Sequence, residues 1–445
     1  MLPSILSIDG FADLRTYTLY ASFIGFLHFG FVDGLNIKYG GDTKSDVDKI
    51  EFNKFHNFFI TLQFFVLLIV ITIALIINNN LILLVGMAIL PINLQSFFLY
   101  YFQAIGEFKE YSKATVIVPI INLVLTLIFI FIGIVDYEVY IFTTILSYLI
   151  SILILEKKYR LHSNFYFVVN LNSIRLIRSF KAYKSIFLSG FYIMLGNILF
   201  TLFFDTGRWM SKIFTANESF AKYSLAISLI GVALVFIGAI NKTFYPYLYH
   251  NNNAVIINKY RSLFYIIGSF ALVGYFFIEL IIIKFLPKYT EALPITAILI
   301  TSIPGIMIIK SIYVNLYKVH KKERKFLSDT LIYLFIAVLL NYFFYQHFKT
   351  LTSISIASVI SIYIWVLFPM TCIKLKIKNI IKEILYLTLI LSLFFLVYYF
   401  YYNAYIVGYN GYNLIFSISI LILSLININL LFFKKVIFNI FHTQI

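Results

Sequence analysis

Thirteen apolar segments constrain this chain more than any other feature of its sequence. Each has roughly the 20 residues that an α-helix needs to cross the hydrocarbon core of a bilayer. The polar breaks between them are too short to hold a folded extramembrane domain. The predicted spans cover residues 17–39, 58–77, 81–105, 114–134, 137–155, 186–210, 219–240, 262–286, 291–317, 327–347, 351–371, 380–402 and 411–433.

Composition supports the same class of protein. Of the 445 residues, 61% are hydrophobic and 12% are charged, whereas a soluble domain carries about 25% charged residues. This excludes a soluble enzyme, a nucleic-acid-binding protein and a disordered scaffold. A single cysteine, Cys372, excludes an intrachain disulfide and a cysteine-based zinc site. The sequence holds no Walker loop, HExxH motif or Cys/His cluster, so we predict no metal, no cofactor and no ATP hydrolysis.

The basic residues predict the orientation of the chain in the membrane. When the loop 156–185 is placed inside, that side holds 27 of the 35 Lys and Arg residues, and the other side holds seven. Such a bias marks cytoplasmic loops, so we expect a cytoplasmic C-terminus. Within the same loop, Arg175, Arg178, Lys181 and Lys184 follow a helical spacing. This predicts an amphipathic helix that lies on the anionic leaflet and links two halves.

An internal repeat relates the two halves. The segment 17–25 aligns without gaps with 223–231 at an offset of 206 residues, and Tyr39 then falls on Tyr245. The same offset maps 58–77 and 81–105 into later predicted spans. Because six spans separate the copies, the repeats are expected to be parallel about an axis normal to the membrane.

The repeat also predicts a missing helix. Span 186–210 opens the second copy, and its partner would lie before Met1, so we expect a further hydrophobic helix of about 20 residues upstream. With it, the plan would be six, six and two spans. The predicted domains are an N-terminal bundle with five of six helices (1–155), a cytoplasmic amphipathic linker (156–185), a C-terminal six-helix bundle (186–373) and two additional helices (374–445).

Several motifs resemble those of the polysaccharide repeat-unit flippases, which transport O-antigen and capsule oligosaccharides. The match covers roughly residues 14–371 and rests on segments in the family's order: Tyr20–Gly34 with its Asp-Gly turn, Phe204–Arg208, Ala221–Ala226, Asn241–Pro246, Leu286–Tyr289 and Asn315–Lys318. In one departure from the family pattern, Thr206 and Gly207 separate Asp205 from Arg208. The first span is also absent.

The resemblance implies a fold and a function. It places the chain in the multidrug/oligosaccharidyl-lipid/polysaccharide exporter superfamily, an all-α polytopic class with two six-helix bundles in a V around a central cavity. It implies a transporter of the bacterial inner (plasma) membrane rather than an enzyme. The implied substrate is an undecaprenyl-pyrophosphate-linked oligosaccharide, moved to the outer leaflet for surface polysaccharide such as lipopolysaccharide or capsule. Implied partners are this lipid, membrane lipids and other membrane proteins of polysaccharide assembly.

Charges inside spans are the candidate substrate-binding residues, because such charges are costly and usually face a cavity or a partner. Asp205, Arg208 and Lys212 share one helical face, with Trp209 beside them. Arg and Lys can hold phosphate oxygens, and Trp can stack on sugars. Lys310 is expected nearer the cytoplasmic end of its span and Arg208 nearer the outer end. The alternative, structural interpretation is that the group on the face of Asp205, Arg208 and Lys212 anchors the helix at the membrane interface.

Three further residues are candidates for ion coupling. Asp33 and Glu279 are carboxylates within spans, and His28 can titrate near neutral pH. Each also has a structural interpretation, as a helix-end carboxylate or a packing histidine. A drug or cation antiporter of the same superfamily is one alternative function. A polytopic polymerase or acyltransferase is another, although a polymerase of this kind needs a long external loop that is lacking here.

Overall fold

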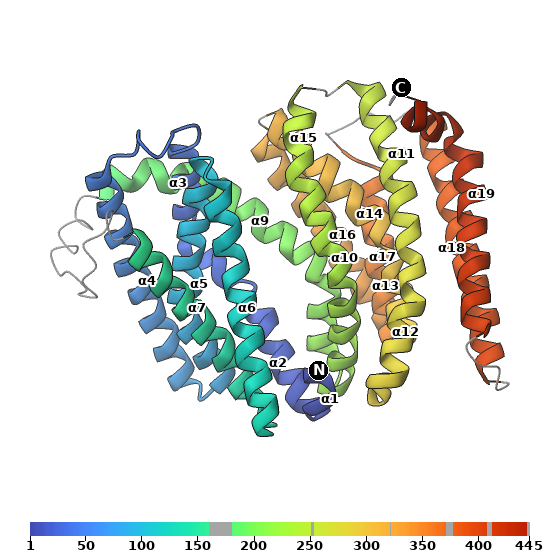
Figure 1. The fold of residues 1–445 in the computed structure, drawn as a ribbon, viewed down its shortest axis with the longest axis horizontal. Helices are drawn as coiled ribbons and strands as arrows, with labels where there is room; N and C mark the ends of the chain where they lie inside the picture. The colour runs from blue at the N-terminus through green and yellow to red at the C-terminus, as the bar shows by residue number, and fades with distance from the viewer. Residues whose placement is uncertain (160–179, 251–252, 321, 371–376, 407–411, 443–445) are drawn as a thin grey trace. The chain divides into compact units, whose positions relative to one another are not determined.

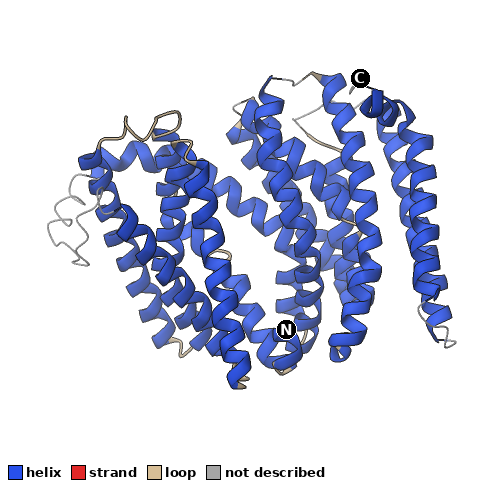
Figure 2. Ribbon diagram, in the orientation of Figure 1, coloured by secondary structure: helices blue, strands red, loops and turns tan. Residues whose placement is uncertain are grey.

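The computed structural model describes residues 1–159, 180–250, 253–320, 322–370, 377–406 and 412–442 (Figure 1). Within these residues the regular structure is helical and no strand occurs (Figure 2). The chain divides into two compact units, Met1–Leu199 and Phe200–Ile445. The boundary falls inside one long helix, α9 (Phe180–Phe214), which contributes to both units.

The predicted spans coincide with the helices. In the described residues, ten helices are long and apolar enough to cross a membrane, two bent helix pairs pass the same test, and α17 (Leu351–Leu367) is a shorter apolar helix. Each of the predicted spans falls on one of these. Large apolar side chains also face outward, as Phe131 (94% exposed) and Leu123 (57% exposed) do on one helix. The all-α polytopic fold is thus confirmed.

Unit 1 is held together by aromatic side chains. Phe31 stacks on Phe59 with ring centroids 5.5 Å apart, and Phe58 stacks on Tyr183 of α9 at 4.5 Å. All four rings belong to one buried cluster. Its helices before α9 are α1 (Leu2–Ile5), α2 (Ile8–Ala21), the 3₁₀ helix η1 (Ile24–His28), α3 (Phe31–Lys38), α4 (Lys49–Ile76), α5 (Asn80–Ala104), α6 (Phe108–Ile132) and α7 (Tyr137–Tyr159).

The first predicted span, 17–39, is not one helix. The segments Ile8–His28 and Phe31–Lys38 meet at 54°. Phe29 and Gly30 have φ values of 53° and 83°, in the left-handed region that glycine tolerates best. The Gly30 N–H donates a 3.1 Å hydrogen bond to Nδ1 of His28. The helix breaks here because two consecutive residues have a left-handed backbone conformation, which does not fit a right-handed helix.

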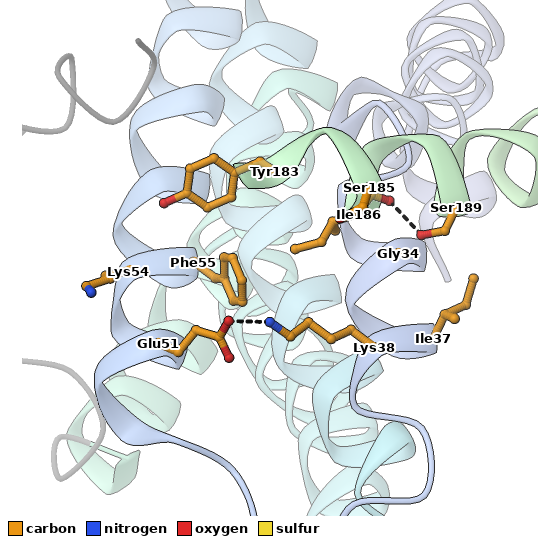
Figure 3. A pocket seen from close by; sticks show the side chains of 10 residues that line it. All are labelled: Gly34, Ile37, Lys38, Glu51, Lys54, Phe55, Tyr183, Ser185, Ile186 and Ser189. Carbon is orange, nitrogen blue, oxygen red and sulfur yellow. Dashed lines mark hydrogen bonds and ion pairs between the residues drawn. The ribbon is translucent and has the colours of Figure 1, made fainter. Parts of the chain in front are cut away.

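Two glycines bring α3 and the start of α9 into close contact. A Cβ on Gly34 would collide with the backbone carbonyl of Ile186, and a Cβ on Gly190 would collide with the carbonyl of Gly30. Small residues of this kind let helix backbones approach within membranes. Beside this crossing lies a pocket of about 580 Å³, lined by the end of α3 and the beginnings of α4 and α9 (Figure 3).

Unit 2 packs around Trp365, which is fully buried and stacks on Tyr333 with centroids 4.5 Å apart. Its helices after α9 are α10 (Asn217–His250), α11 (Ala254–Phe270), η2 (Ala271–Val273), α12 (Gly274–Phe285), η3 (Pro287–Tyr289), α13 (Ala292–Ile300), α14 (Ile303–Ile308), the π-helical η4 (Ile309–Tyr313), α15 (Val314–Val319), α16 (Glu323–Phe348), α17, α18 (Ile377–Ile406) and α19 (Tyr412–His442).

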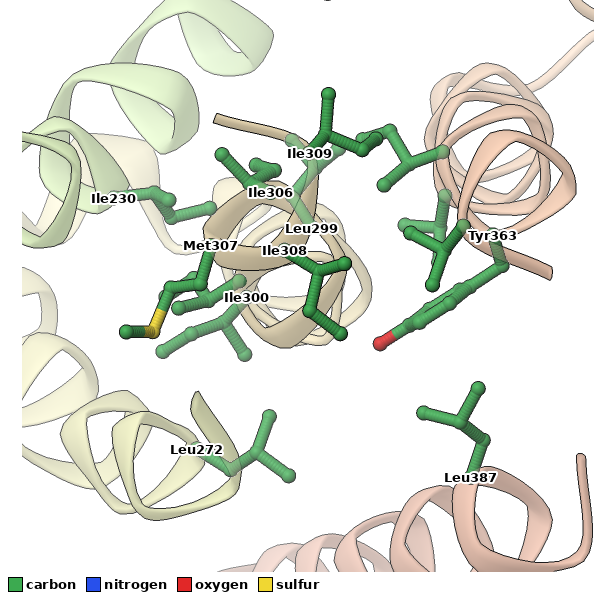
Figure 4. Packing of buried hydrophobic residues seen from close by; sticks show 14 of the residues in the cluster. Ile230, Leu272, Leu299, Ile300, Ile306, Met307, Ile308, Ile309, Tyr363 and Leu387 are labelled. Carbon is green, nitrogen blue, oxygen red and sulfur yellow. The ribbon is translucent and has the colours of Figure 1, made fainter. Parts of the chain in front are cut away.

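A second broken span runs through the centre of unit 2. The segments Ala292–Ile300 and Ile303–Val319 meet at 44°, and apolar side chains from α10, η2, α17 and α18 surround them (Figure 4). Pro304 has no N–H to donate at the start of α14. Hydroxyl groups donate to carbonyls at this break: Tyr363 donates to the Thr301 carbonyl at 2.5 Å, and Ser302 donates to the Leu299 carbonyl at 2.6 Å.

Other predictions meet the structure less directly. Pro91 and Pro119 lie inside the helices α5 and α6, which continue past them. Helix α4 begins at Lys49, nine residues before the apolar span, because Asp48 caps it by accepting a 2.8 Å hydrogen bond from the Ile50 N–H. The predicted amphipathic helix of the linker lies largely outside the described residues.

Candidate functional site

The predicted charged stripe on α9 contains an ion pair. Arg208 Nη1 lies 3.5 Å from Asp205 Oδ1, and the two side chains are 12% and 18% exposed. They are three residues apart on one helix, a spacing that places side chains on the same face. Charged groups this far from water must be neutralised, either by each other or by a bound ligand.

Gly207 lies between Asp205 and Arg208 in the sequence and packs closely against α10. A Cβ at this position would collide with the hydroxyl of Tyr223 on α10 and would lie 2.6 Å from Oγ of Ser358. The Tyr223 hydroxyl is 3.5 Å from Ser358 Oγ, which donates at 3.1 Å to Oδ1 of Asn341. The glycine thus makes room for a polar chain beside the ion pair. Sequence reasoning missed this chain, because its members come from three separate helices.

Lys310 belongs to the same neighbourhood. Its Nζ lies 5.0 Å from the ring centroid of Phe204, a cation–π distance, and its charge acts on the carboxylate of Asp205. Lys310 is the second residue of the π-helical turn η4. Such turns are rare and frequent at functional sites. The charges of both cations, Arg208 and Lys310, therefore act on one carboxylate.

The remaining members of the stripe lie apart from this cluster. Lys212 Nζ donates at 3.0 Å to Oδ1 of Asn217 and lies 5.1 Å from the Phe220 ring centroid. These contacts tie the end of α9 to the start of α10. Trp209, the residue after Arg208, is half-buried. The arrangement that the structure brings together is thus Asp205, Arg208 and Lys310, with an aromatic wall at Phe204.

The cluster has the chemistry of an anion site. Two cations and one carboxylate carry a net charge of +1, so an entering phosphate would find a counter-charge already in place. Arg offers a planar fork that binds two oxygens, and Lys offers a point charge. When no anion is bound, Asp205 neutralises the cations, which reduces the cost of holding them in the membrane. A phosphate would then compete with Asp205 for Arg208.

His28 and Asp33 lie at the break of the first span. His28 Nε2 is 3.7 Å from Asp33 Oδ2, and the two residues are 5% and 3% exposed. Because the Gly30 N–H donates to Nδ1 of His28, that nitrogen carries no proton, and the ring proton lies on Nε2, toward Asp33. The geometry favours a neutral histidine that orients the carboxylate. Asp33 therefore keeps more support as an ion-coupling residue than His28 does.

Glu279 is the third predicted ion-coupling residue. It lies in α12 and is 2% exposed. Within the described residues its Oε2 atom has no hydrogen-bond partner. Tyr275, one turn earlier, and Tyr398 of α18 interact electrostatically with its carboxylate. A buried carboxylate with an unsatisfied oxygen is expensive, so Glu279 remains a candidate for binding a proton or a cation.

Two buried ion pairs escaped the sequence analysis. His56 Nε2 lies 2.6 Å from Glu156 Oε1, with both side chains almost fully buried. Arg261 Nη2 lies 2.5 Å from Glu383 Oε2, and Tyr265 donates to the same oxygen at 3.0 Å. In each pair the partners are about a hundred residues or more apart in sequence. No local pattern could have joined them.

Comparison with solved structures finds a similar chain described as "Lipid II flippase MurJ, inward closed conformation". The TM-score is 0.67, the identity is 16%, and the alignment covers 97% of each chain. At this identity the likeness establishes the fold alone, an all-α polytopic membrane fold. No protein-family model matches the chain, and no curated protein matches it.

Proposed function

We propose that this protein is a flippase for an undecaprenyl-pyrophosphate-linked oligosaccharide. It would carry this lipid from the cytoplasmic to the outer leaflet of the bacterial inner membrane, for surface polysaccharide synthesis. Three observations support the proposal: the MurJ-like fold, the family motifs around Asp33 and Arg208, and a buried cation cluster in unit 2. The cluster carries most weight, because its chemistry matches the diphosphate of the lipid.

The cluster suggests how the diphosphate would be held. One phosphate would take the fork of Arg208, which is now 3.5 Å from Asp205. The other would meet Lys310, whose ammonium faces the Phe204 ring. Asp205 would then be released from Arg208 and would regain it when the lipid leaves. Exchange of one anion for another keeps the buried charge nearly constant through the cycle, which limits the cost of transport.

Complementation of a flippase-null strain tests the proposal. A charge-assisted hydrogen bond contributes about 1.5–3 kcal/mol, so Arg208→Ala should lower surface polysaccharide roughly tenfold or more. Arg208→Lys should restore only part of it, because Lys lacks the bidentate fork. Lys349→Gln is the matched control, since this exposed lysine contacts only Gln346 and Tyr345 among the described residues. Membrane levels of each variant are measured by immunoblot.

Two outcomes would argue against the proposal. Full polysaccharide from a well-expressed Arg208→Ala, Lys310→Ala double variant would make both residues structural. Failure of the wild-type chain to complement any polysaccharide strain, together with proton- or sodium-dependent efflux of cationic dyes, would favour the antiporter alternative.

The orientation needs its own test. The 27-to-7 division of Lys and Arg leads us to propose a cytoplasmic C-terminus. A fluorescent protein fused after Ile445 should then be bright, and alkaline phosphatase fused at the same place should be inactive. The opposite pair of results would reverse the orientation.

A further inference from the structure

The pocket at one end of unit 1 lies outside the cation cluster and has no role in the proposed transport. Its volume is about 580 Å³. Three elements line it: α3 with Gly34, Ile37 and Lys38; α4 with Glu51, Lys54 and Phe55; and α9 with Tyr183, Ser185, Ile186 and Ser189. Figure 3 shows Lys38 and Glu51 reaching toward each other across the pocket.

The lining combines cations and hydroxyls on an apolar wall. Lys38 is ion-paired with Glu51, and its Nζ lies 4.4 Å from the Phe55 ring centroid. Lys54 is exposed at the rim, and no carboxylate in the described part of the chain pairs with it. Figure 3 shows its side chain turned outward from the pocket, within the reach of a flexible four-carbon stem.

The α9 side of the pocket supplies further donors. Ser185 is exposed, and the Ser189 hydroxyl donates at 2.9 Å to the Ile186 carbonyl. Ile37, beside Lys38, is 49% exposed although it is apolar. An apolar surface that adjoins lysines and hydroxyls is suited to bind a molecule with one apolar end and one anionic end.

The pocket also lies at the right depth for a head group. Helix α3 ends at Lys38 and α4 begins at Lys49, so the lining residues belong to the last turns or first turns of spans. By the division of Lys and Arg residues, these ends face the cytoplasm. Basic pockets between helices on that side bind lipid head groups.

We propose that this pocket binds the phosphodiester head group of a membrane phospholipid. Lys38, Lys54 and Glu51 carry a net charge of +1, which balances the single negative charge of a phosphodiester. A lipid diphosphate carries at least two charges and would remain undercompensated. The phosphate accepts from Lys54 and Ser185, while an acyl chain lies along Ile37. Because the pocket adjoins the Gly34–Ile186 contact, the bound lipid strengthens the packing of α9 on α3.

The experiment uses the purified full-length chain in detergent, with lipid binding followed by native mass spectrometry and thermal stability. The probe is dioleoyl phosphatidylglycerol, a phosphodiester lipid. Each Lys near an anionic lipid contributes about 1 kcal/mol, so Lys54→Gln should weaken binding roughly fivefold. Lys49→Gln is the matched control: it removes a charge from the same end of α4, and Lys49 does not line the pocket.

Three further arms identify the source of the phosphate. Dioleoylglycerol, which lacks phosphate, should not compete, and inorganic phosphate should compete weakly because it lacks the chains. Undecaprenyl diphosphate should bind this pocket less well than the phosphodiester lipid. The proposal is overturned if Lys54→Gln and Lys49→Gln weaken phosphatidylglycerol binding equally, if dioleoylglycerol competes, or if the diphosphate lipid is preferred.

A second variant guards against misfolding. The double change Lys38→Gln and Glu51→Gln keeps the net charge and a neutral hydrogen-bonding pair, so phosphatidylglycerol should still bind through Lys54 and Ser185. Loss of binding in a folded double variant would contradict the proposed charge balance. The Arg208 variants of unit 2 should bind phosphatidylglycerol normally, so failure of this proposal and failure of the proposed transport are separate results.

Discussion

The two copies of the predicted repeat break in different spans. At the offset of 206 residues, the broken first span α2–η1–α3 corresponds to α10, which is one continuous helix from Asn217 to His250. The broken span α13–α15 corresponds to α5, which is continuous from Asn80 to Ala104. Each copy thus breaks the span that the other copy keeps intact.

Local residues account for this difference. Gly30 allows the left-handed turn of the first break, and its counterpart in α10 is Phe236, which fits an ordinary helix. Pro304 opens α14 after the second break, and its counterpart in α5 is Phe98. A shared helical plan therefore coexists with breaks that individual substitutions created.

The charges at the two breaks are opposite. The first break carries the carboxylate of Asp33 beside a histidine, and the span of the second break carries the ammonium of Lys310 within reach of Asp205. We expect a lipid diphosphate to be drawn to the second region rather than to the first. The comparison agrees with a proposed diphosphate site in unit 2 and leaves Asp33 of unit 1 a candidate for ion coupling.

Both units hold a buried basic side chain near the start of a helix. His56 and Arg261 each lie seven positions after the first residue of their helices, α4 and α11. Each pairs with an acid from a later helix, Glu156 or Glu383. At the offset of 206 residues His56 falls on Ser262, one residue after Arg261, and the acidic partners do not correspond.

The largest expected effect comes from filling the close contact between α3 and α9. Gly34→Leu places a side chain where the backbone of Ile186 lies, so the two helices must separate. We expect loss of folded protein, measured by fluorescence-detected size-exclusion chromatography. Gly231→Leu is the control, because nothing lies within 4 Å of a Cβ there. Normal folding of the Gly34 variant would contradict the close packing.

The anchored pairs predict the next largest effect. Arg261→Met leaves Glu383 buried without its cation, and breaking a buried ion pair in this way costs about 3–5 kcal/mol. The double change Arg261→Met and Glu383→Leu should recover most of that loss. Thermal unfolding in detergent measures both. If the single and double variants are equally destabilised, Arg261 stabilises the fold through packing rather than through its ion pair with Glu383. The comparison with the His56–Glu156 pair would then no longer hold.

A smaller effect of opposite sign is expected at Lys310. Lys310→Met removes a costly buried charge and keeps the volume, so thermal stability should rise by roughly 1–3 kcal/mol. Complementation by the same variant should fall, because the ammonium group that would bind the phosphate is gone. A residue that only supports the fold would lower both quantities. Lys310→Met that is less stable and equally active would remove Lys310 from the site.

The smallest effect tests the cause of the breaks. Phe236→Gly puts glycine at the position of Gly30 in the second copy, and a glycine inside a helix costs about 1 kcal/mol. The helix α10 should stay continuous, because no histidine precedes the new glycine to accept its N–H. Spin-label distances along α10 should be unchanged. A bend near 54° would show that glycine alone makes the break.

Hydropathy predicted the spans because lipid imposes long apolar helices on any chain that crosses it. The break at Gly30 could not be predicted from the sequence, since it involves the Nδ1 atom of His28 as well as the glycine. The cluster was predicted in part: Asp205 and Arg208 are neighbours on one helix, whereas Lys310 joins them from a segment a hundred residues away.

The central claim is that the cations of unit 2 bind the diphosphate of the transported lipid. Translocation of a fluorescent undecaprenyl-pyrophosphate oligosaccharide in proteoliposomes measures this most directly. We expect wild-type vesicles to expose the lipid to an external quencher or glycosidase, and the Arg208→Ala, Lys310→Ala double variant to lose at least tenfold in rate. The Asp33→Asn variant should bind the lipid normally even if it transports slowly. Equal rates for the wild type and the double variant, at equal reconstituted protein, would contradict the account.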